Sequence, residues 1–249
     1  GVALAAAVMV KTWPALLVPP LLASGRWRAA VWSVAATGAA VVAWAVWAGV
    51  DGPLQVLSFR GATGWHVEST GGIVTVLWSG ADAALEAGAY RVGSAPLAAK
   101  AVGALAVVAV TSAACVGVWL RSGEQAADGA DEPAPGATAE LAALASIAAL
   151  LVASPLLSPQ FLVWLTPWAA VAAAAGHRRI ALVVAAACAL TQVTLVAFSP
   201  AGLDATAPAL LLGVRNALLG AAALSSVRIL LAPRRATASD HQPAVTPGG

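Results

Sequence analysis

Long apolar runs separated by short polar segments dominate this chain, and these runs set the expected architecture. A helix needs about 20 consecutive apolar residues to cross the hydrocarbon core of a bilayer. Stretches of roughly that length occur about seven times. We expect membrane-spanning helices at residues 1–23, 29–50, 97–120, 140–157, 160–176, 179–199 and 207–231.

The fourth and fifth runs are separated by a segment that contains two prolines. In Ser154-Pro155-Leu156-Leu157-Ser158-Pro159-Gln160 the prolines favour the end of one helix and the start of another. A single kinked helix over 140–176 is the alternative, but about 37 residues exceed the length of one crossing. Since no segment alternates polar and apolar residues as a strand does, we predict an all-α, polytopic helical bundle.

The positions of the basic residues favour one orientation in the membrane. The segments after the first, third, fifth and seventh runs carry Arg26, Arg28, Arg121, His177, Arg178, Arg179, Arg234 and Arg235. The positive-inside rule assigns these segments to the cytoplasm, so the loop over 51–96 is expected to be extracytoplasmic. We expect one transmembrane domain over 1–232, with an acidic cytoplasmic loop over 121–139 and a disordered cytoplasmic tail over 233–249.

The composition agrees with a multi-pass protein of the plasma membrane. Hydrophobic residues make up 60% of the chain and charged residues 10%, whereas soluble domains carry about 25% charged residues. The net charge of +2 and the lack of a basic, aromatic-interleaved groove argue against nucleic-acid binding. Cys115 and Cys188 lie in apolar runs without Cys or His at ligand spacing, which predicts packed thiols and no metal site. The chain starts at Gly1 without a signal peptide, and we expect its natural N-terminal part to be missing.

Two cations lie within the predicted spans and need an explanation. Lys11 lies about 20 Å from the cytoplasmic end of the first run, and a charge at mid-helix costs about 2.5–3.5 kcal/mol. Arg215 lies in the outer half of the last run beside Asn216, and arginine binds phosphate bidentately. A lysine that snorkels outward and an arginine paired with a buried carboxylate are the alternatives, although the spans contain almost no acid. We favour a shared role for both cations in binding the phosphate of a lipid.

The external loop carries the most polar stretch of the chain, Arg60-Gly61-Ala62-Thr63-Gly64-Trp65-His66-Val67-Glu68-Ser69. His66 and Glu68 have the chemistry for proton transfer or for holding sugar hydroxyls. The glycines here and at 71 and 72 permit close backbone approach. The apolar stretch 73–78 indicates a short helix at the membrane surface. An ordinary solvated loop is the alternative.

Ser158 and Gln160 lie on the same outer side in this topology. The Gln160 amide can hydrogen-bond a sugar, and Ser158 can cap a helix. Polar groups gathered at the outer face suit a lipid phosphate whose tail lies in the bilayer. This pattern is compatible with a transferase that uses lipid-linked substrates and with a lipid-phosphate transporter.

Four blocks of sequence together resemble glycosyltransferase family 87, the polytopic mannosyltransferases of the GT-C superfamily typical of actinobacteria. The blocks are Lys11-Thr12-Trp13-Pro14, Arg60-Gly61 leading to His66-Val67-Glu68-Ser69, Ser158-Pro159-Gln160-Phe161-Leu162-Val163-Trp164-Leu165, and Arg215-Asn216. The similarity extends from Lys11 to about Arg235. The fold that it implies is a GT-C-like membrane bundle.

The resemblance also implies a reaction. Members of this family transfer mannose from polyprenyl-phosphate-mannose to a glycolipid or glycan acceptor outside the cytoplasm, with α-1,2-type linkages and inversion at the anomeric carbon. No cofactor is implied. An acidic residue takes the acceptor proton. In this superfamily it usually lies on the first external loop, which this chain is expected to lack.

The implied roles fall on eight residues. The donor phosphate is assigned to Lys11, Arg215 and Arg60. His66 and Glu68 are assigned to a proton relay or to sugar contact, and Gln160, Ser158 and Asn216 to sugar binding.

A transporter or flippase for a lipid-linked or anionic solute is the alternative function, because the same cations would serve it. Transporters often have two related halves with broken helices. This chain has a proline-interrupted region near 154–160 and no clear counterpart. A purely structural membrane subunit would leave Lys11 and Arg215 unexplained.

Overall fold

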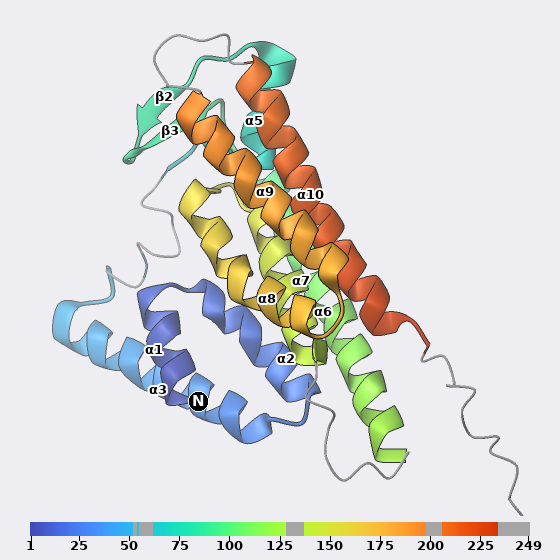
Figure 1. The fold of residues 1–249 in the computed structure, drawn as a ribbon. Helices are drawn as coiled ribbons and strands as arrows, with labels where there is room; N and C mark the ends of the chain where they lie inside the picture. The colour runs from blue at the N-terminus through green and yellow to red at the C-terminus, as the bar shows by residue number, and fades with distance from the viewer. Residues whose placement is uncertain (52–53, 55–61, 128–136, 198–205, 234–249) are drawn as a thin grey trace, which may run out of the picture.

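The computed structural model describes residues 1–51, 54, 62–127, 137–197 and 206–233 (Figure 1). It is mostly helical, with 78% helix and 5% strand, which confirms the predicted helical class. The predicted tail over 233–249 lies, apart from its first residue, outside the described residues.

A bundle of long helices forms the body of the protein. It contains α6 (Leu97–Ala127), α7 (Ala137–Ala153), α9 (Arg178–Ala197) and α10 (Thr206–Leu231). Helix α7 packs against both α6 and α10, and its leucines and alanines are buried on all sides. A helix that is apolar all round is buried, either among other elements or in lipid. Its small alanine side chains let the neighbouring helices approach closely.

Three helices of the described chain are long and apolar enough to cross a membrane: α3 (Trp27–Ala48), the part of α6 over Leu97–Gly123, and α10. Shorter apolar helices occur at Trp13–Ala23, Thr70–Ser79 and Thr138–Ala153. These apolar helices are compatible with a membrane protein. The other predicted crossings are not among these three helices.

The first predicted crossing, 1–23, is not one continuous helix. Helix α1 (Val2–Val10) ends at Lys11, whose backbone is extended with φ −149° and ψ 135°. A 3-10 helix, η1 (Trp13–Leu17), and the short helix α2 (Val18–Ala23) follow. Each has a proline within its first two positions. Proline is tolerated there because the first N–H groups of a helix have no partner within it.

The N-terminal segment forms a short helical hairpin. The Ser33 hydroxyl donates to the Gly1 carbonyl at 3.2 Å, so α1 begins beside the first turns of α3. Helix α2 ends close to the start of α3, so α1 and α2 run in opposite directions (Figure 1). Lys11 therefore lies at the turn of a hairpin and not in the middle of a helix.

The proline-containing segment separates two helical regions, as predicted. Helix α7 ends at Ala153, and a 3-10 helix, η3 (Pro159–Leu165), leads into α8 (Thr166–Ala174). The expectation of one regular helix over 160–176 is wrong. Prolines at positions 159 and 167 divide the segment into two short helices.

The predicted cytoplasmic loop over 121–139 is shorter than expected. Helix α6 continues to Ala127 and α7 starts at Ala137, so residues 122–127 and 137–139 are helical. Arg121 stabilises this end of the bundle, because its Nε donates to the Leu230 carbonyl at 3.0 Å and its guanidinium also bonds the carbonyls of Ile229 and Ala232. A cation at the C-terminus of α10 satisfies carbonyls that have no helical partner.

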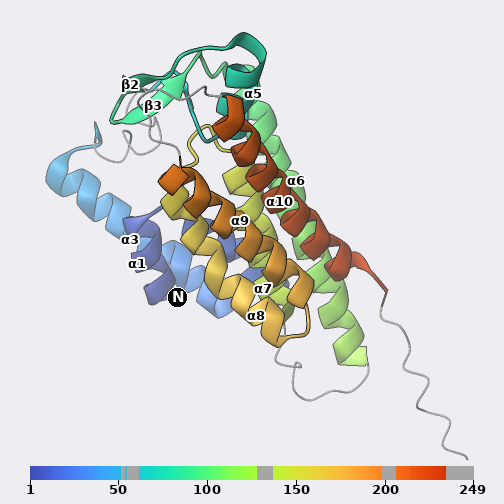
Figure 2. The ribbon, with the colours of Figure 1, turned by 45° about the horizontal axis from the view of Figure 1, so that its top comes forward.

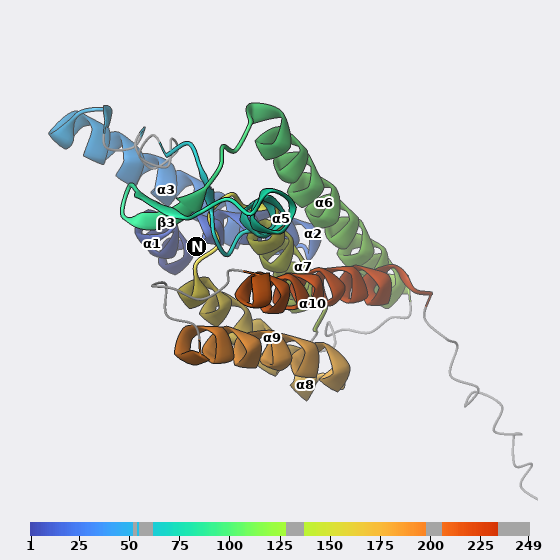
Figure 3. The same ribbon diagram turned by 90° about the horizontal axis from the view of Figure 1, so that it is seen from above.

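The loop over 62–96 contains the short helix predicted at 73–78 and, in addition, a small sheet that was not predicted. Strands β1 (Trp65–His66), β3 (Ala89–Val92) and β2 (Ala84–Glu86) form an antiparallel sheet in that order. Helix α5 (Thr70–Ser79) lies between β1 and β2 in the sequence. The sheet and α5 lie over one end of the bundle (Figures 2 and 3). Strands of two to four residues are too short to give an alternating pattern.

Candidate functional site

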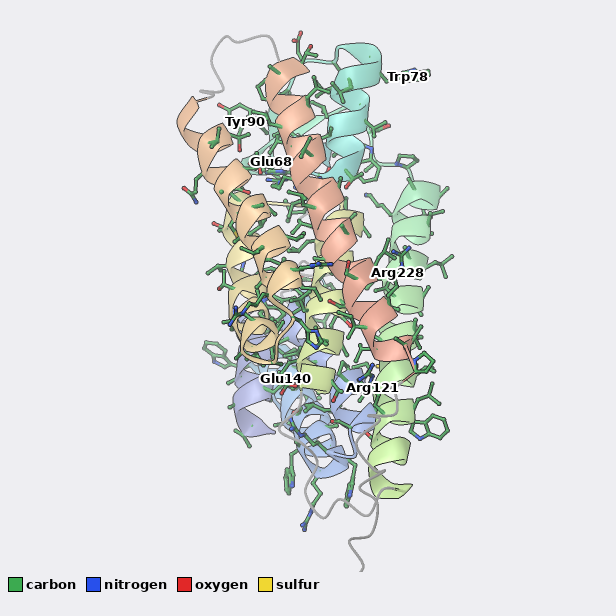
Figure 4. The ribbon with its side chains drawn as sticks, turned by 45° about the vertical axis from the view of Figure 1, so that its right-hand side comes forward. Glu68, Trp78, Tyr90, Arg121, Glu140 and Arg228 are labelled. Atoms are coloured by element: carbon green, nitrogen blue, oxygen red, sulfur yellow. The ribbon has the colours of Figure 1, made fainter. Side chains whose placement is uncertain are left out.

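A buried ion pair joins the loop over 62–96 to the last helix. Arg215 of α10 is 0% exposed, and its Nη1 donates to Glu68 Oε2 at 2.5 Å. Its Nη2 donates to the Glu68 carbonyl at 2.7 Å. Glu68, on the turn between β1 and α5, lies at the α5 end of α10 (Figure 4). Because a guanidinium removed from water needs a counter-charge, this pair holds the loop on the helix.

Asn216 extends the same network. Its side-chain oxygen accepts from Arg215 Nε at 3.0 Å, and its amide donates to the Glu68 carbonyl at 3.2 Å and to the Thr70 hydroxyl at 3.3 Å. The Thr70 hydroxyl donates to the Val152 carbonyl at 2.7 Å. The network therefore links α10, the loop over 62–96 and the end of α7. Asn216 is buried and bonded to protein, which favours positioning over sugar contact.

His66 is buried beside this network. Its backbone N–H donates to the Pro155 carbonyl at 3.0 Å, and its Nδ1 accepts from the Glu68 N–H at 3.3 Å. Burial, together with the charges of Arg91 and Arg215, lowers the pKa of His66 from 6.5 to about 4. The ring is neutral at pH 7, with its proton on Nε2. Burial raises the pKa of Glu68, and the bond from Arg215 opposes that shift.

Two glycines and a serine set the position of Glu68. Ser69 caps α5, because its hydroxyl accepts from the Gly72 N–H at 3.1 Å and donates to the His66 carbonyl at 2.7 Å. A Cβ on Gly72 would overlap the His66 carbonyl, and one on Gly71 would overlap the Trp65 ring. The close backbone approach expected from these glycines is confirmed.

A second polar cluster holds the sheet together. The two carboxylate oxygens of Glu86 accept hydrogen bonds from the segment before β1, from the Thr63 N–H at 2.7 Å and the Gly64 N–H at 3.0 Å. Arg91 is buried, and its Nη1 donates to the Gly64 carbonyl at 2.9 Å. Hydrogen bonds from Thr63 and Gly64 lower the pKa of Glu86. These two charged residues shape the loop that presents Glu68.

Lys11 lies on a different surface, against η3. Its ammonium is over the Phe161 ring, 5.4 Å from the ring centre. The Phe161 ring stacks on Trp164 at 4.4 Å, and Trp164 stacks on Trp13 at 5.0 Å. Lys11 is exposed. The first and third blocks of the resemblance are therefore in contact, through a cation beside an aromatic stack.

Ser158 and Gln160 line a cavity of about 590 Å³ between η3 and α9. The cavity also contains Thr191 and Gln192 of α9. Ser158 precedes η3 without a side-chain capping bond, so the capping role is not observed. Neither Lys11 nor Arg215 lines this cavity.

The structure does not support the expectation that Lys11 and Arg215 share one phosphate. Lys11 lies over Phe161, whereas Arg215 is bound by Glu68. The counter-ion of Arg215 is Glu68 of the loop over 62–96, an acid that lies outside the predicted spans. Arg60, the third predicted phosphate ligand, lies outside the described residues.

Several residues of the site were not predicted from the sequence. Thr70, Glu86 and Arg91 build the loop, and Gln192 lines the cavity. Gln192 carried a usable signal, because an amide within an apolar run needs a polar neighbour. The contacts of Glu86 and Arg91 depend on a sheet that was not expected.

No known protein family model matches this chain, and neither a curated protein nor a solved structure matches it.

Proposed function

We propose that this protein is a membrane glycosyltransferase. It transfers a mannosyl or other hexosyl unit from a polyprenyl-phosphate-linked donor to a glycolipid or glycan acceptor. The site faces the extracytoplasmic side of the plasma membrane, and the fold is GT-C-like. In this proposal α7, α9 and the η3–α8 segment cross the bilayer together with α3, α6 and α10, and the N-terminal hairpin enters it.

The observation that carries the proposal is that the four blocks of the resemblance meet in two pairs, the first with the third and the second with the fourth. Lys11 lies over Phe161, and Glu68 pairs with Arg215. The His66 N–H bonds the Pro155 carbonyl, just before the Ser-Pro-Gln-Phe block. Blocks far apart in the sequence thus form two clusters of polar and aromatic groups next to an apolar bundle. A lipid-linked substrate requires such a neighbourhood, since its phosphate is charged and its chain is apolar.

The contacts suggest revised roles for the two cations. Lys11 is exposed and is the cation we assign to the donor phosphate, whereas Arg215 positions Glu68 and the loop. The hairpin supports this role for Lys11: the nine residues of α1 rise about 14 Å, roughly half of a 30 Å hydrocarbon core. A lysine at that depth gains from an anionic ligand.

The test is transfer of labelled mannose from polyprenyl-phosphate-mannose in membranes that contain the intact protein. Replacement of Lys11 by methionine is expected to raise the KM for the donor about 10- to 100-fold, the loss expected for a charge-assisted hydrogen bond. Arg26→Gln, at an exposed cation before α3, is the matched control and should leave KM unchanged.

The loop is tested by a second pair of variants. Glu68→Gln should reduce kcat per folded molecule, whereas Asp82→Asn, at an exposed carboxylate of the same loop, should not. Transfer with unchanged kinetic constants in both Lys11→Met and Glu68→Gln would remove the site assignment.

A transporter or flippase of a lipid-linked or anionic solute is the second candidate. The observation that favours it is the break at Lys11, because transporters use discontinuous helices to bind charged substrates at membrane depth. Movement of the lipid-linked sugar between leaflets without a new glycosidic bond would support this candidate over the transferase.

A further inference from the structure

The cavity between η3 and α9 has a lining without formal charge. Its polar side chains are those of Ser158, Gln160, Thr166, Thr191 and Gln192. Pro159, Leu162 and Val163 add an apolar surface. A cavity of about 590 Å³ lies within the range of small-molecule sites, which is about 300–1,000 Å³.

Two amides face this cavity with their hydrogen-bonding groups free for a ligand. Gln160 and Gln192 are both exposed, and neither makes a hydrogen bond within the described residues. The hydroxyls of Thr166 and Thr191 donate to carbonyls of their own helical segments, at 2.8 Å and 3.0 Å, and keep a free acceptor lone pair. Each primary amide offers two donors and one acceptor. In an apolar surrounding, a polar group without a partner costs several kcal/mol.

If α9 crosses the bilayer as proposed, Gln192 needs a hydrogen-bonding partner. It lies 14 residues after the first residue of α9, Arg178, so it is about 21 Å along the helix axis. If α9 starts at the inner boundary of a hydrocarbon core of about 30 Å, Gln192 lies in the outer third. Bulk water does not satisfy an amide at that depth unless a cavity admits it.

The chemistry of the lining selects the ligand. Phosphate is disfavoured, because no cation lines the cavity. Lys11 contacts Phe161, which is not part of the lining. Paired donors and acceptors beside aliphatic carbon match a sugar ring, which carries hydroxyls at its edge and C–H groups on its faces.

We propose that this cavity binds the uncharged, hydroxyl-rich headgroup of a glycolipid, with Gln160 and Gln192 as its hydrogen-bonding residues. The inference rests on the proposed function in one respect: it assigns the cavity to the acceptor, while the phosphate-bearing donor binds at Lys11. The binding itself does not require transfer.

The test is photolabelling of the intact protein in nanodiscs with an octyl mannoside that carries a diazirine on its alkyl chain. Label is expected on peptides that contain residues 158–166 and 188–192. Gln192→Leu and Gln160→Leu should each reduce labelling there about five- to tenfold, the loss expected for one hydrogen bond of about 1 kcal/mol or slightly more. Val193→Leu is the matched control, because Val193 is 50% exposed on the same helix and does not line the cavity.

Competition identifies the class of ligand. An excess of unlabelled octyl mannoside should abolish labelling of these peptides, and an excess of dodecyl phosphate should not. The inference is overturned if both glutamine variants label like the wild type, or if dodecyl phosphate competes as well as the mannoside.

Failure of this inference is distinguishable from failure of the proposed function. Mannose transfer with an acceptor KM that is unaffected in Gln192→Leu would overturn the cavity assignment and leave the transferase intact. Specific labelling of the cavity without mannose transfer by the wild type would support the cavity assignment and overturn the transferase proposal.

Discussion

Removal of either partner of the Glu68–Arg215 pair is expected to destabilise the protein strongly. The guanidinium is 0% exposed and the Glu68 side chain is 15% exposed, so bulk water cannot satisfy the guanidinium and reaches the carboxylate only in part. Two unit charges in contact attract by about 4 kcal/mol at the effective dielectric near a protein surface. Loss of one partner leaves the other buried and uncompensated, at a cost of about 3–5 kcal/mol.

Thermal unfolding in nanodiscs, followed by the fluorescence of the ten tryptophans, measures this effect. For a chain of this size, a loss of about 3–5 kcal/mol lowers the apparent Tm by about 6–20 °C. We expect this shift for Glu68→Met and for Arg215→Met. The exposed Asp82→Asn is the control and should change Tm by less than about 2 °C.

The double variant Glu68→Met/Arg215→Met distinguishes an ion pair from two independent contacts. Replacement of both charges by apolar side chains removes the uncompensated charge, so the double variant should be more stable than the sum of the single changes by at least about 2 kcal/mol. Strictly additive losses, or single variants with the Tm of the wild type, would refute the assignment of a buried pair.

Three further predictions concern the loop over 62–96. Folding lowers the pKa of His66 from 6.5 to about 4, so the unfolded chain binds more protons between these pH values. The free energy of unfolding should therefore fall by up to about 3 kcal/mol as the pH drops from about 6.5 to 4, which Tm measured against pH checks. An equal slope of Tm against pH in His66→Asn, which keeps an acceptor near Nδ1, would contradict this prediction. Gly72→Ala should lower Tm by several degrees, because a Cβ would overlap the His66 carbonyl, whereas Gly80→Asn, at an open helix end with φ +60°, should be tolerated. Trp78 is 92% exposed at the end of α5 and points away from the bundle (Figure 4). Brominated lipids should therefore quench its fluorescence, measured as the difference in quenching between the wild type and Trp78→Phe. No difference in quenching would show that α5 does not contact the bilayer.

The helical regions were predictable because apolar runs of this length have few alternative structures. The predicted runs 29–50 and 207–231 correspond to α3 and α10 within two residues at each end. The segment 1–23 shows where this reasoning fails: hydrophobicity alone does not report direction, and the prolines at 14, 19 and 20 turn the run into a hairpin. The apolar run around Lys11 predicts a position within a helix, but the prolines in that run place Lys11 at a turn.

The candidate site was predicted as a set of residues but not as a set of contacts. His66, Glu68, Arg215 and Asn216 do come together. The Glu68–Arg215 pair was not predicted because Glu68 lies on a loop, and the sequence alone does not show which loop residue contacts which helix. Strands of two to four residues, which orient that loop, leave no periodic signal.

The most direct test of the proposed function follows the sugar and its lipid carrier separately. Proteoliposomes that contain the intact protein are supplied with a polyprenyl-phosphate-mannose whose mannose is tritiated and whose chain is fluorescent, together with an alkyl mannoside acceptor. The transferase proposal predicts that tritium moves to the acceptor while the fluorescent polyprenyl phosphate is released, and that Lys11→Met slows this separation. If tritium and fluorescence stay on one molecule, whether or not it changes leaflet, the protein does not catalyse glycosyl transfer from this donor.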